Sequence, residues 1–224
     1  MNPALRSSAA HVFVESVEAP SPSDDDMHHL GRVLRLRNGE HVTVSDGVGR
    51  WRVTELHSGA LVPVGEVLTE PAAAEVTIAA AIPKGDRLEW MIQKLTELGV
   101  ARIMLVDCAR SVVRWDAARA SRQMQRLERV AREAAMQSRR VWLPVLAGPV
   151  HVAAVLAADN VLVADPSGAV LSDRSRTVAP TVVIGPEGGF YDAELAAASE
   201  VVSLGPLVLR VETAAIVAAV RFLT

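Results

Sequence analysis

The chain has 224 residues, of which 50% are hydrophobic and 22% charged, and its formal net charge is −3. This length suits one large domain or two small ones, and the hydrophobic content excludes a disordered chain. Prolines interrupt the longest uncharged run, residues 141–158, and the amino terminus lacks the apolar core of a secretory signal. The single cysteine, Cys108, excludes an internal disulfide and a cysteine-rich zinc site. We therefore expect a soluble, cytoplasmic protein without a metal.

Positive charge is concentrated in the middle of the chain. Residues 83–140 carry 13 Lys/Arg and 7 Asp/Glu, whereas residues 1–82 carry 6 and 11, and residues 141–224 carry 4 and 8. A basic segment within a mildly acidic chain indicates an anionic partner at one place. Solvated arginine-rich helices are common, however, so the excess alone does not establish a nucleic-acid partner.

The first third of the chain is typical of a small β-barrel. Short alternating segments separated by glycine turns predict strands at residues 11–17, 40–45, 50–56 and 61–68. A helical stretch at residues 26–35 interrupts them, with acidic residues at its start. His28 and His29 have no carboxylate or thiol at metal-ligand spacing, so we expect them on the barrel surface. Pro71 marks the predicted boundary between a domain of residues 1–71 and one of residues 72–224.

From Val76 onward, apolar strands alternate with helices. The pattern predicts strands at residues 76–82, 102–106, 161–164, 181–184 and 201–204. It predicts helices at residues 87–98, 116–139, 192–198 and 211–223. Such alternation is typical of an α/β domain with a mostly parallel sheet covered on both faces. Three tryptophans are expected to be packing residues: Trp90, Trp115 and Trp142.

The predicted helix at residues 116–139 has two distinct faces. Its expected core face comprises Met124, Leu127, Ala131, Ala134 and Ala135. A separate quarter of its circumference carries the arginines Arg119, Arg122, Arg126, Arg129 and Arg140, with no acidic residue among them. The guanidinium fork suits phosphate, so we expect contact with RNA or DNA. The alternative is a face that arginine merely keeps solvated.

Two glycine-proline loops follow apolar strands near the carboxyl end. Residues 181–184 precede Gly185-Pro186-Glu187-Gly188-Gly189-Phe190, and Asp192 offers an N-cap for the next helix. A second strand precedes Leu204-Gly205-Pro206. Glycine permits close backbone approach, and open α/β sheets bind ligands beyond the carboxyl ends of their strands. The chain has neither G-x-G-x-x-G nor a P-loop motif, which argues against a Rossmann enzyme and a P-loop NTPase.

At these residues the chain resembles the ribosomal RNA small subunit methyltransferase E family. Three segments carry the likeness: the loop at residues 184–190 with Glu194, then Leu204-Gly205, and then the sequence Leu-Arg-Val-Glu-Thr-Ala at residues 209–214. Earlier segments agree in order along the chain: residues 28–35, 39–40, 46–47, 82–85, 93–100, 110–113 and 134–138. Three positions depart from the family pattern: Met136, Arg139 and Leu207. Because position 136 is Met, the resemblance gives little support for a carboxylate that acts beside Gln137. Because position 207 is Leu, this chain lacks one positive charge near the cofactor loop that the family pattern has.

The resemblance implies a SPOUT-type, trefoil-knotted α/β methyltransferase domain preceded by a PUA-like β-barrel. It implies methylation of N3 of a single uridine in 16S ribosomal RNA, within the 30S subunit, by a homodimer that uses S-adenosylmethionine. The residues implied to surround the cofactor are Gly185, Pro186, Glu187, Gly188, Gly189, Leu204, Gly205, Leu209, Arg210 and Thr213. Further cations expected at the RNA are Arg35, Lys84 and Lys94.

Arg210 is the expected catalytic residue, because a cation would stabilise the uracil anion that forms when the N3 proton leaves. Its alternative role is structural, pairing with Glu187 or Glu212. A general base is not identified by the sequence. Two other functions stay open at this point: a SPOUT enzyme acting on tRNA or on another ribosomal RNA site, and a non-enzymatic RNA-binding assembly factor.

Overall fold

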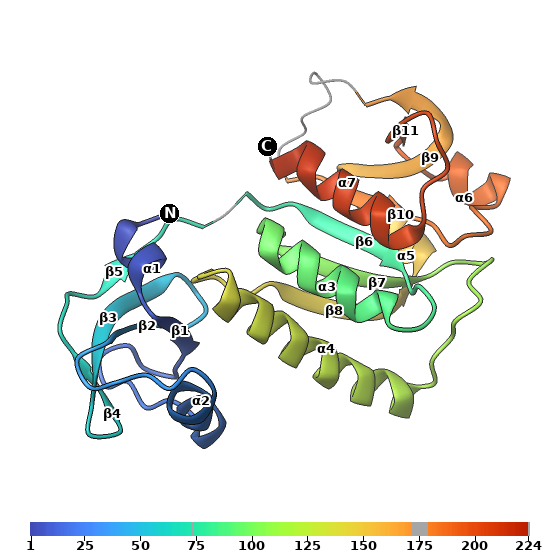
Figure 1. Ribbon diagram of the computed structural model, residues 1–224. Coiled ribbons are helices and arrows are strands. Elements are labelled where there is room, and N and C mark those ends of the chain that lie inside the picture. Colours follow the sequence, from blue (N-terminus) through green and yellow to red (C-terminus); the bar gives the residue numbers. More distant parts are fainter. Residues whose placement is uncertain (73, 172–178, 224) are drawn as a thin grey trace. The chain divides into compact units, whose positions relative to one another are not determined.

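A computed structural model describes residues 1–72, 74–171 and 179–223 and divides the chain into two compact units (Figure 1). The first unit contains Met1–Ala72 and Arg132–Leu143, and the second contains Ala73–Ala131 and Pro144–Thr224. The segment 132–143 thus packs with the amino-terminal unit, although it is distant in sequence. No helix in the described ranges is long and apolar enough to cross a membrane.

The first unit is built on a five-stranded sheet with β1 paired to β2 in parallel and the other pairs antiparallel. The strands are β1 (Ala10–Phe13), β2 (His41–Ser45), β3 (Arg50–His57), β4 (Ala60–Pro63) and β5 (Leu68–Thr69). Their order in the sheet is β1-β2-β3-β4, and β5 pairs with β3. Its helices are α1 (Pro3–Ser7), α2 (Asp24–His28) and the π-helical turn η1 (His29–Val33). Strands β1 and β2 are shorter than the alternation predicts, β3 extends one residue further, and the predicted strand at residues 61–68 is replaced by β4 and β5. The predicted helix divides into α2 and η1. His28 and His29 are exposed, as expected.

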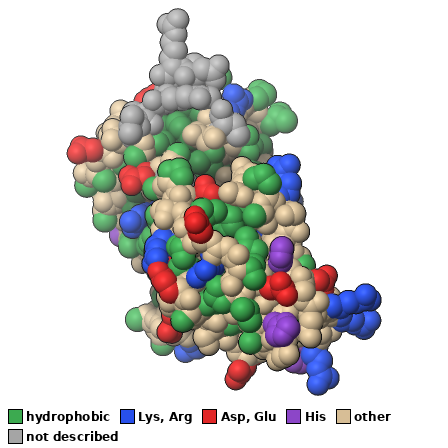
Figure 2. Space-filling view, turned by 90° about the vertical axis from the view of Figure 1, so that its left-hand side faces the viewer, with side chains coloured by type: hydrophobic (Ala, Val, Ile, Leu, Met, Phe, Trp, Pro, Cys, Tyr) green, Lys and Arg blue, Asp and Glu red, His purple; other side chains and the backbone are tan. Residues whose placement is uncertain are grey.

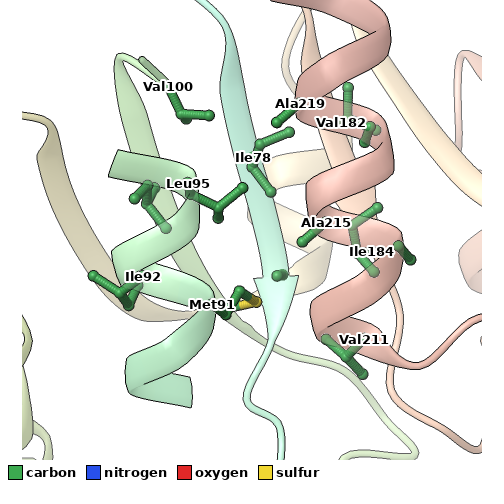
Figure 3. Close-up of a cluster of buried hydrophobic side chains, with 14 of the residues drawn as sticks. Ile78, Met91, Ile92, Leu95, Val100, Val182, Ile184, Val211, Ala215 and Ala219 are labelled. Atoms are coloured by element: carbon green, nitrogen blue, oxygen red, sulfur yellow. The ribbon is translucent and has the colours of Figure 1, made fainter. Parts of the chain in front are cut away.

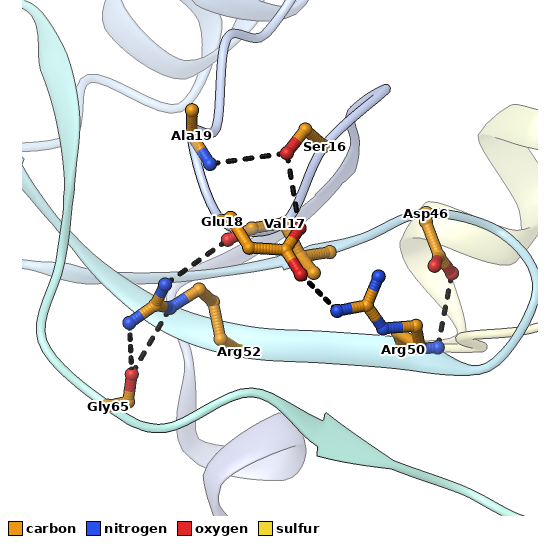
Figure 4. A network of polar contacts seen from close by, with 8 residues as sticks. All are labelled: Ser16, Val17, Glu18, Ala19, Asp46, Arg50, Arg52 and Gly65. Atoms are coloured by element: carbon orange, nitrogen blue, oxygen red, sulfur yellow. Dashed lines mark hydrogen bonds and ion pairs between the residues drawn. The ribbon is translucent and has the colours of Figure 1, made fainter.

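Arginines connect the loops of this unit to its sheet. Arg52 on β3 donates hydrogen bonds to the carbonyl oxygens of Gly65 (3.1 Å from Nε) and Val17 (3.3 Å from Nη1), and Arg50 pairs with Glu18 (Figure 4). Arg132 donates to Asp26 Oδ2 at 2.7 Å and to the carbonyl of Phe13 at 3.0 Å. The arginines at the end of the basic segment therefore have structural partners within the first unit.

The second unit contains a six-stranded sheet, in the order β11-β9-β10-β6-β7-β8, with every pairing parallel. Its strands are β6 (Thr77–Ala81), β7 (Arg102–Asp107), β8 (Val145–His151), β9 (Val161–Val170), β10 (Thr181–Ile184) and β11 (Glu200–Ser203). Its helices are α3 (Arg87–Leu98), α5 (Val152–Leu156), α6 (Asp192–Ala196) and α7 (Val211–Leu223), together with the first part of α4 (Ala117–Gln137). The expected parallel α/β sheet is confirmed.

Alternate residues of the central strands supply two cores on opposite faces of this sheet. Ile78 of β6 and Val182 of β10 belong to the core that α3 and α7 cover, as Figure 3 shows. Ala79 and Val183, the next residues along, belong to the core on the face of α5. Cys108 is buried in that second core. Each large apolar side chain that is fully buried stabilises the fold by about 1.5–3 kcal/mol.

Several elements of the second unit differ from the sequence prediction. The pattern gives no strand at β8 and no helix at α5, because Gly148 and Pro149 interrupt the apolar run. Strand β9 continues to Val170 instead of ending at residue 164. Helix α4 ends at Gln137, since Arg139 adopts a left-handed φ of 60°. Helix α6 starts with Asp192, and its N-cap is Tyr191, so the prediction of an Asp192 cap is wrong.

Candidate functional site: a cavity at the carboxyl ends of parallel strands

A cavity of about 590 Å³ lies in the second unit, where strands β10 and β11 end and β9 reaches Ala164. Three stretches of chain line it: residues 164–167, residues 184–190, and residues 203–211 except Pro206, with Ala214 of α7. The strands run parallel, so their carboxyl ends meet at one edge of the sheet, the usual position of ligand sites in such folds. Both glycine-proline loops thus meet at one site.

Backbone geometry at the first loop requires glycine at two positions. A Cβ atom on Gly185 would lie 2.7 Å from the ring of Phe190, so any larger residue would displace that ring. Gly189 has a φ of 71°, and its N–H donates to the carbonyl of Pro186 at 2.8 Å to close the turn. The conformation of this loop therefore depends on glycine at both positions.

Residues beyond the cavity hold this loop in place. Glu194 accepts hydrogen bonds from the N–H groups of Tyr191 (2.8 Å) and Ala109 (3.0 Å), which joins the loop to the segment after β7. Arg110 donates to the carbonyl of Gly188 at 2.8 Å, and its guanidinium lies 4.2 Å from the Tyr191 ring centroid. The sequence does not single out Arg110 or Tyr191 as site residues, because these contacts join segments about eighty residues apart.

The middle of strand β9, not expected from the sequence as part of the site, completes the cavity wall. Asp165 and Ser167 follow the apolar start of β9, and the Asp165 carboxylate accepts from the N–H (2.9 Å) and hydroxyl (2.7 Å) of Ser167. The sequence Asp-Pro-Ser-Gly at residues 165–168, which follows an apolar run, is the feature that could have marked this part of the wall. The wall therefore combines apolar side chains and backbone with two carboxylates, Asp165 and Glu187.

Arg210 lies in the wall of this cavity and is exposed. No ion pair to it occurs among the described residues. Glu187 and Glu212 instead lie 3.7 Å and 3.6 Å from Nη1 of Arg87, at the start of α3. The alternative in which Arg210 pairs with one of these glutamates is therefore wrong. Arg87 links the first glycine loop to the start of α7 and leaves the Arg210 guanidinium available.

Nine of the ten residues expected around a cofactor line the cavity, and Thr213 lines a neighbouring one. Of the expected RNA-binding cations on α4, Arg119, Arg122, Arg126 and Arg129 are exposed. Arg126 pairs with Glu89 of α3 at 2.7 Å, so the face has an acidic neighbour that helix periodicity did not reveal.

The other expected cations are not part of α4. Arg140 follows the end of α4, and burial lowers its pKa to about 10. Lys84 and Arg35 are exposed, and Lys94 pairs with Glu97 at 2.9 Å. Figure 2 shows Lys/Arg side chains interspersed with acidic and apolar ones on one face of the molecule.

Comparison with known proteins gives consistent matches. A family model described as an RNA methyltransferase domain matches residues 70–222, and one described as an RNA methyltransferase PUA domain matches residues 22–58. The ribosomal RNA small subunit methyltransferase E of Mycobacterium bovis is 36% identical over 219 residues, covering 87% of this chain and 82% of that protein. The Bacillus subtilis protein of the same name is 32% identical over 223 residues, covering 88% and 87%.

Solved structures agree. A putative methyltransferase from Legionella pneumophila in complex with the cofactor SAM superposes with a TM-score of 0.80 at 28% identity, covering 94% of this chain and 95% of that one. The ribosomal RNA small subunit methyltransferase E of Neisseria gonorrhoeae bound to S-adenosyl methionine gives 0.77 at 25% identity, with the same coverage. The expected α/β fold with a PUA domain is confirmed. By these matches, the chain belongs to the ribosomal RNA small subunit methyltransferase E family.

Proposed function

We propose that this protein is an S-adenosylmethionine-dependent methyltransferase that modifies N3 of a specific uridine in 16S ribosomal RNA. The observation that carries the proposal is the cavity at the carboxyl ends of β10 and β11, beside the middle of β9 and lined by the family's glycine loops. Family membership and the two neighbours solved with the methyl donor support the reaction class and the cofactor.

The residues of the cavity fit S-adenosylmethionine. Its volume of about 590 Å³ lies in the range of small-molecule sites, roughly 300–1,000 Å³. Gly185 leaves room for the Phe190 ring, and both residues line the cavity. Asp165 and Glu187 supply carboxylates that suit ribose hydroxyls and a sulfonium charge. When bound, the donor supplies an electrophilic methyl group.

The chain's own contribution is alignment and control of a proton. The loops 185–189 and 204–205 with Leu209 would hold the donor, and fixed alignment of two reactants can contribute roughly 7–11 kcal/mol. Arg210 would stabilise the negative charge that develops on the uracil as the N3 proton leaves. The base must present its Watson–Crick edge, so the uridine would be unpaired or swung out of its helix.

Several finer features belong to the same proposal. We propose residues 1–71 as the RNA-binding domain and residues 72–224 as the methyltransferase domain, with a trefoil knot near the cofactor site. We also propose a cytoplasmic homodimer that acts on the assembled 30S subunit. The exposed apolar residues Leu207 and Val208, 75% and 87% accessible, are consistent with a covered surface in such a dimer.

Two measurements test this function. Calorimetry should detect one S-adenosylmethionine site per chain, and Gly185→Val should abolish it because its side chain would displace Phe190. Mass spectrometry of 16S RNA from a deletion strain should show loss of one N3-methyluridine, which returns on complementation. An unchanged 16S RNA together with a lost methyl group in tRNA or 23S RNA would move the substrate elsewhere. Failure of the wild-type chain to bind the donor would contradict the proposal altogether.

The exposed arginines of α4 predict a salt-dependent RNA affinity. Arg122→Ala should weaken binding to a 16S RNA fragment and reduce the slope of log K against log salt by about 0.7–0.9, the value of one lost phosphate contact. Arg122 is the suitable position because it is exposed and has no ion pair in the described ranges, whereas Arg126 pairs with Glu89. Arg221→Ala on α7 is a charge-matched control. Equal slopes for both variants would identify the face as merely solvated.

A further inference from the structure

A second cavity, of about 550 Å³, adjoins the proposed donor site in the same unit. It lies between the starts of α3 and α7 and shares residues 208–210 with the first cavity. Arg210 therefore lines both. The residues that belong to the second cavity alone are Arg87, Trp90, Glu212 and Thr213.

Trp90 is unusually exposed for its type. The neighbouring residues of α3, Met91 and Ile92, are fully buried, whereas Trp90 is 46% accessible at the cavity wall. The prediction that Trp90 is a packing residue is therefore wrong, because much of its ring is accessible. An accessible indole beside cationic side chains is a common platform on which proteins stack an unpaired base.

Glu212 has an unused acceptor. The residue is 5% exposed, its Oε1 lies 3.6 Å from Arg87 Nη1, and its Oε2 has no hydrogen-bond partner among the described residues. Buried polar atoms nearly always have a partner, so Oε2 in this wall is suited to a ligand that brings a donor. Arg210 and the Thr213 hydroxyl add donors to the same cavity.

These groups match one base in particular. The Watson–Crick edge of uracil presents a carbonyl oxygen, the N3–H donor and a second carbonyl oxygen. A wall with one carboxylate acceptor and neighbouring donors is complementary to that order. Cytosine presents an unprotonated N3 instead, which would face the Glu212 carboxylate without a hydrogen bond. The wall therefore favours uracil by leaving the wrong base unpaired.

We propose that this second cavity is the subsite for the accepting uracil, with Trp90 stacking on its face and Glu212 accepting a hydrogen bond from N3–H. The proposal rests on the proposed function and deepens it by assigning the residues that select the base. Arg210 is then positioned at the boundary between donor and acceptor.

Binding of uridine 5′-monophosphate, in the presence of S-adenosylhomocysteine so that no turnover occurs, tests the subsite. Uridylate should quench part of the tryptophan fluorescence, and Trp90→Phe should remove that component while keeping the affinity. Trp90→Ala should weaken uridylate binding on the order of tenfold, as loss of one stacked base predicts. Glu212→Gln should reduce the preference for uridylate over cytidylate, with folding checked by circular dichroism. Glu200→Gln on β11 is the matched control.

The donor affinity of each variant separates the possible failures. Suppose that the wild-type protein binds the donor and that the Trp90→Ala variant binds uridylate as tightly as the wild type does. This result would overturn the subsite and leave the proposed function intact. Absence of uridylate binding at millimolar concentration would do the same. Wild-type protein that binds neither ligand would overturn both.

Discussion

Replacing Arg210 with alanine is expected to lower kcat for methyl transfer about 100-fold while changing the donor Kd only a few-fold. An imide with a pKa about two units above neutrality costs about 2.7 kcal/mol to ionise at pH 7, at 1.36 kcal/mol per unit. A nearby cation can supply this stabilisation as the negative charge develops. Arg210 is exposed in the wall shared by the two cavities, and no described residue forms an ion pair with it.

The pH dependence distinguishes this electrostatic role from a structural one. The Arg210→Ala variant should regain activity relative to wild type as pH rises, because hydroxide then removes the imide proton without help. Arg210→Lys keeps the charge and should recover part of kcat. Arg87→Ala provides the contrast, since loss of its contacts to Glu187 and Glu212 should weaken donor binding first. A kcat unchanged in Arg210→Ala would remove the residue from the mechanism.

The sequence predicted those parts of the site that depend on local pattern. The β-branched run of β10, the glycines after it and the amphipathic α3 each specify their conformation within a few residues. The two glycine loops could therefore be assigned before the structure, and the parallel sheet brings them together. The predicted bounds of α3 and α7 agree with the structure for the same reason.

Long-range contacts were not predictable in this way. The Arg87–Glu212 ion pair joins residues 125 positions apart, and no periodicity indicates that Arg87, not Arg210, would pair with the glutamate. Strand β8 escaped prediction because Gly148 and Pro149 disrupt its pattern, although pairing with β7 over five positions stabilises it. The sequence of segment 132–143 indicates only the end of a basic helix. It does not predict that Arg132 donates hydrogen bonds to Asp26 and to the carbonyl of Phe13 in the first unit.

A buried histidine in the first unit adds a property unrelated to the site. His11 on β1 is 2% exposed, its Nδ1 lies 2.9 Å from Thr43 Oγ1, and its Nε2 has no partner among the described residues. Burial, and secondarily the positive charges of Arg139 and Arg132, lower the pKa of His11 to about 3. The imidazole is therefore neutral in the folded chain over the whole physiological range.

This neutrality predicts acid sensitivity of the first unit. In the unfolded chain His11 takes up a proton near pH 6.5, whereas the folded chain binds it only near pH 3. The unfolded state therefore binds more protons between these values. The stability present above pH 6.5 should fall by about 1.4 kcal/mol for each pH unit toward 3.

Urea unfolding at pH 7, 5 and 4, followed by tryptophan fluorescence, measures this loss. Trp51 is fully buried in the same unit and reports on it. His11→Asn can keep a hydrogen bond to Thr43 but cannot titrate, so its stability should fall less steeply than that of wild type. The carboxylates titrate equally in both proteins, so the difference between the two curves of stability against pH isolates the contribution of His11. His57→Asn, at an exposed position of β3, controls for the loss of an imidazole. Parallel curves of stability against pH for wild type and His11→Asn would mean that His11 is protonated in the folded chain or reached by water. The inference that His11 is a buried, neutral imidazole would then be wrong.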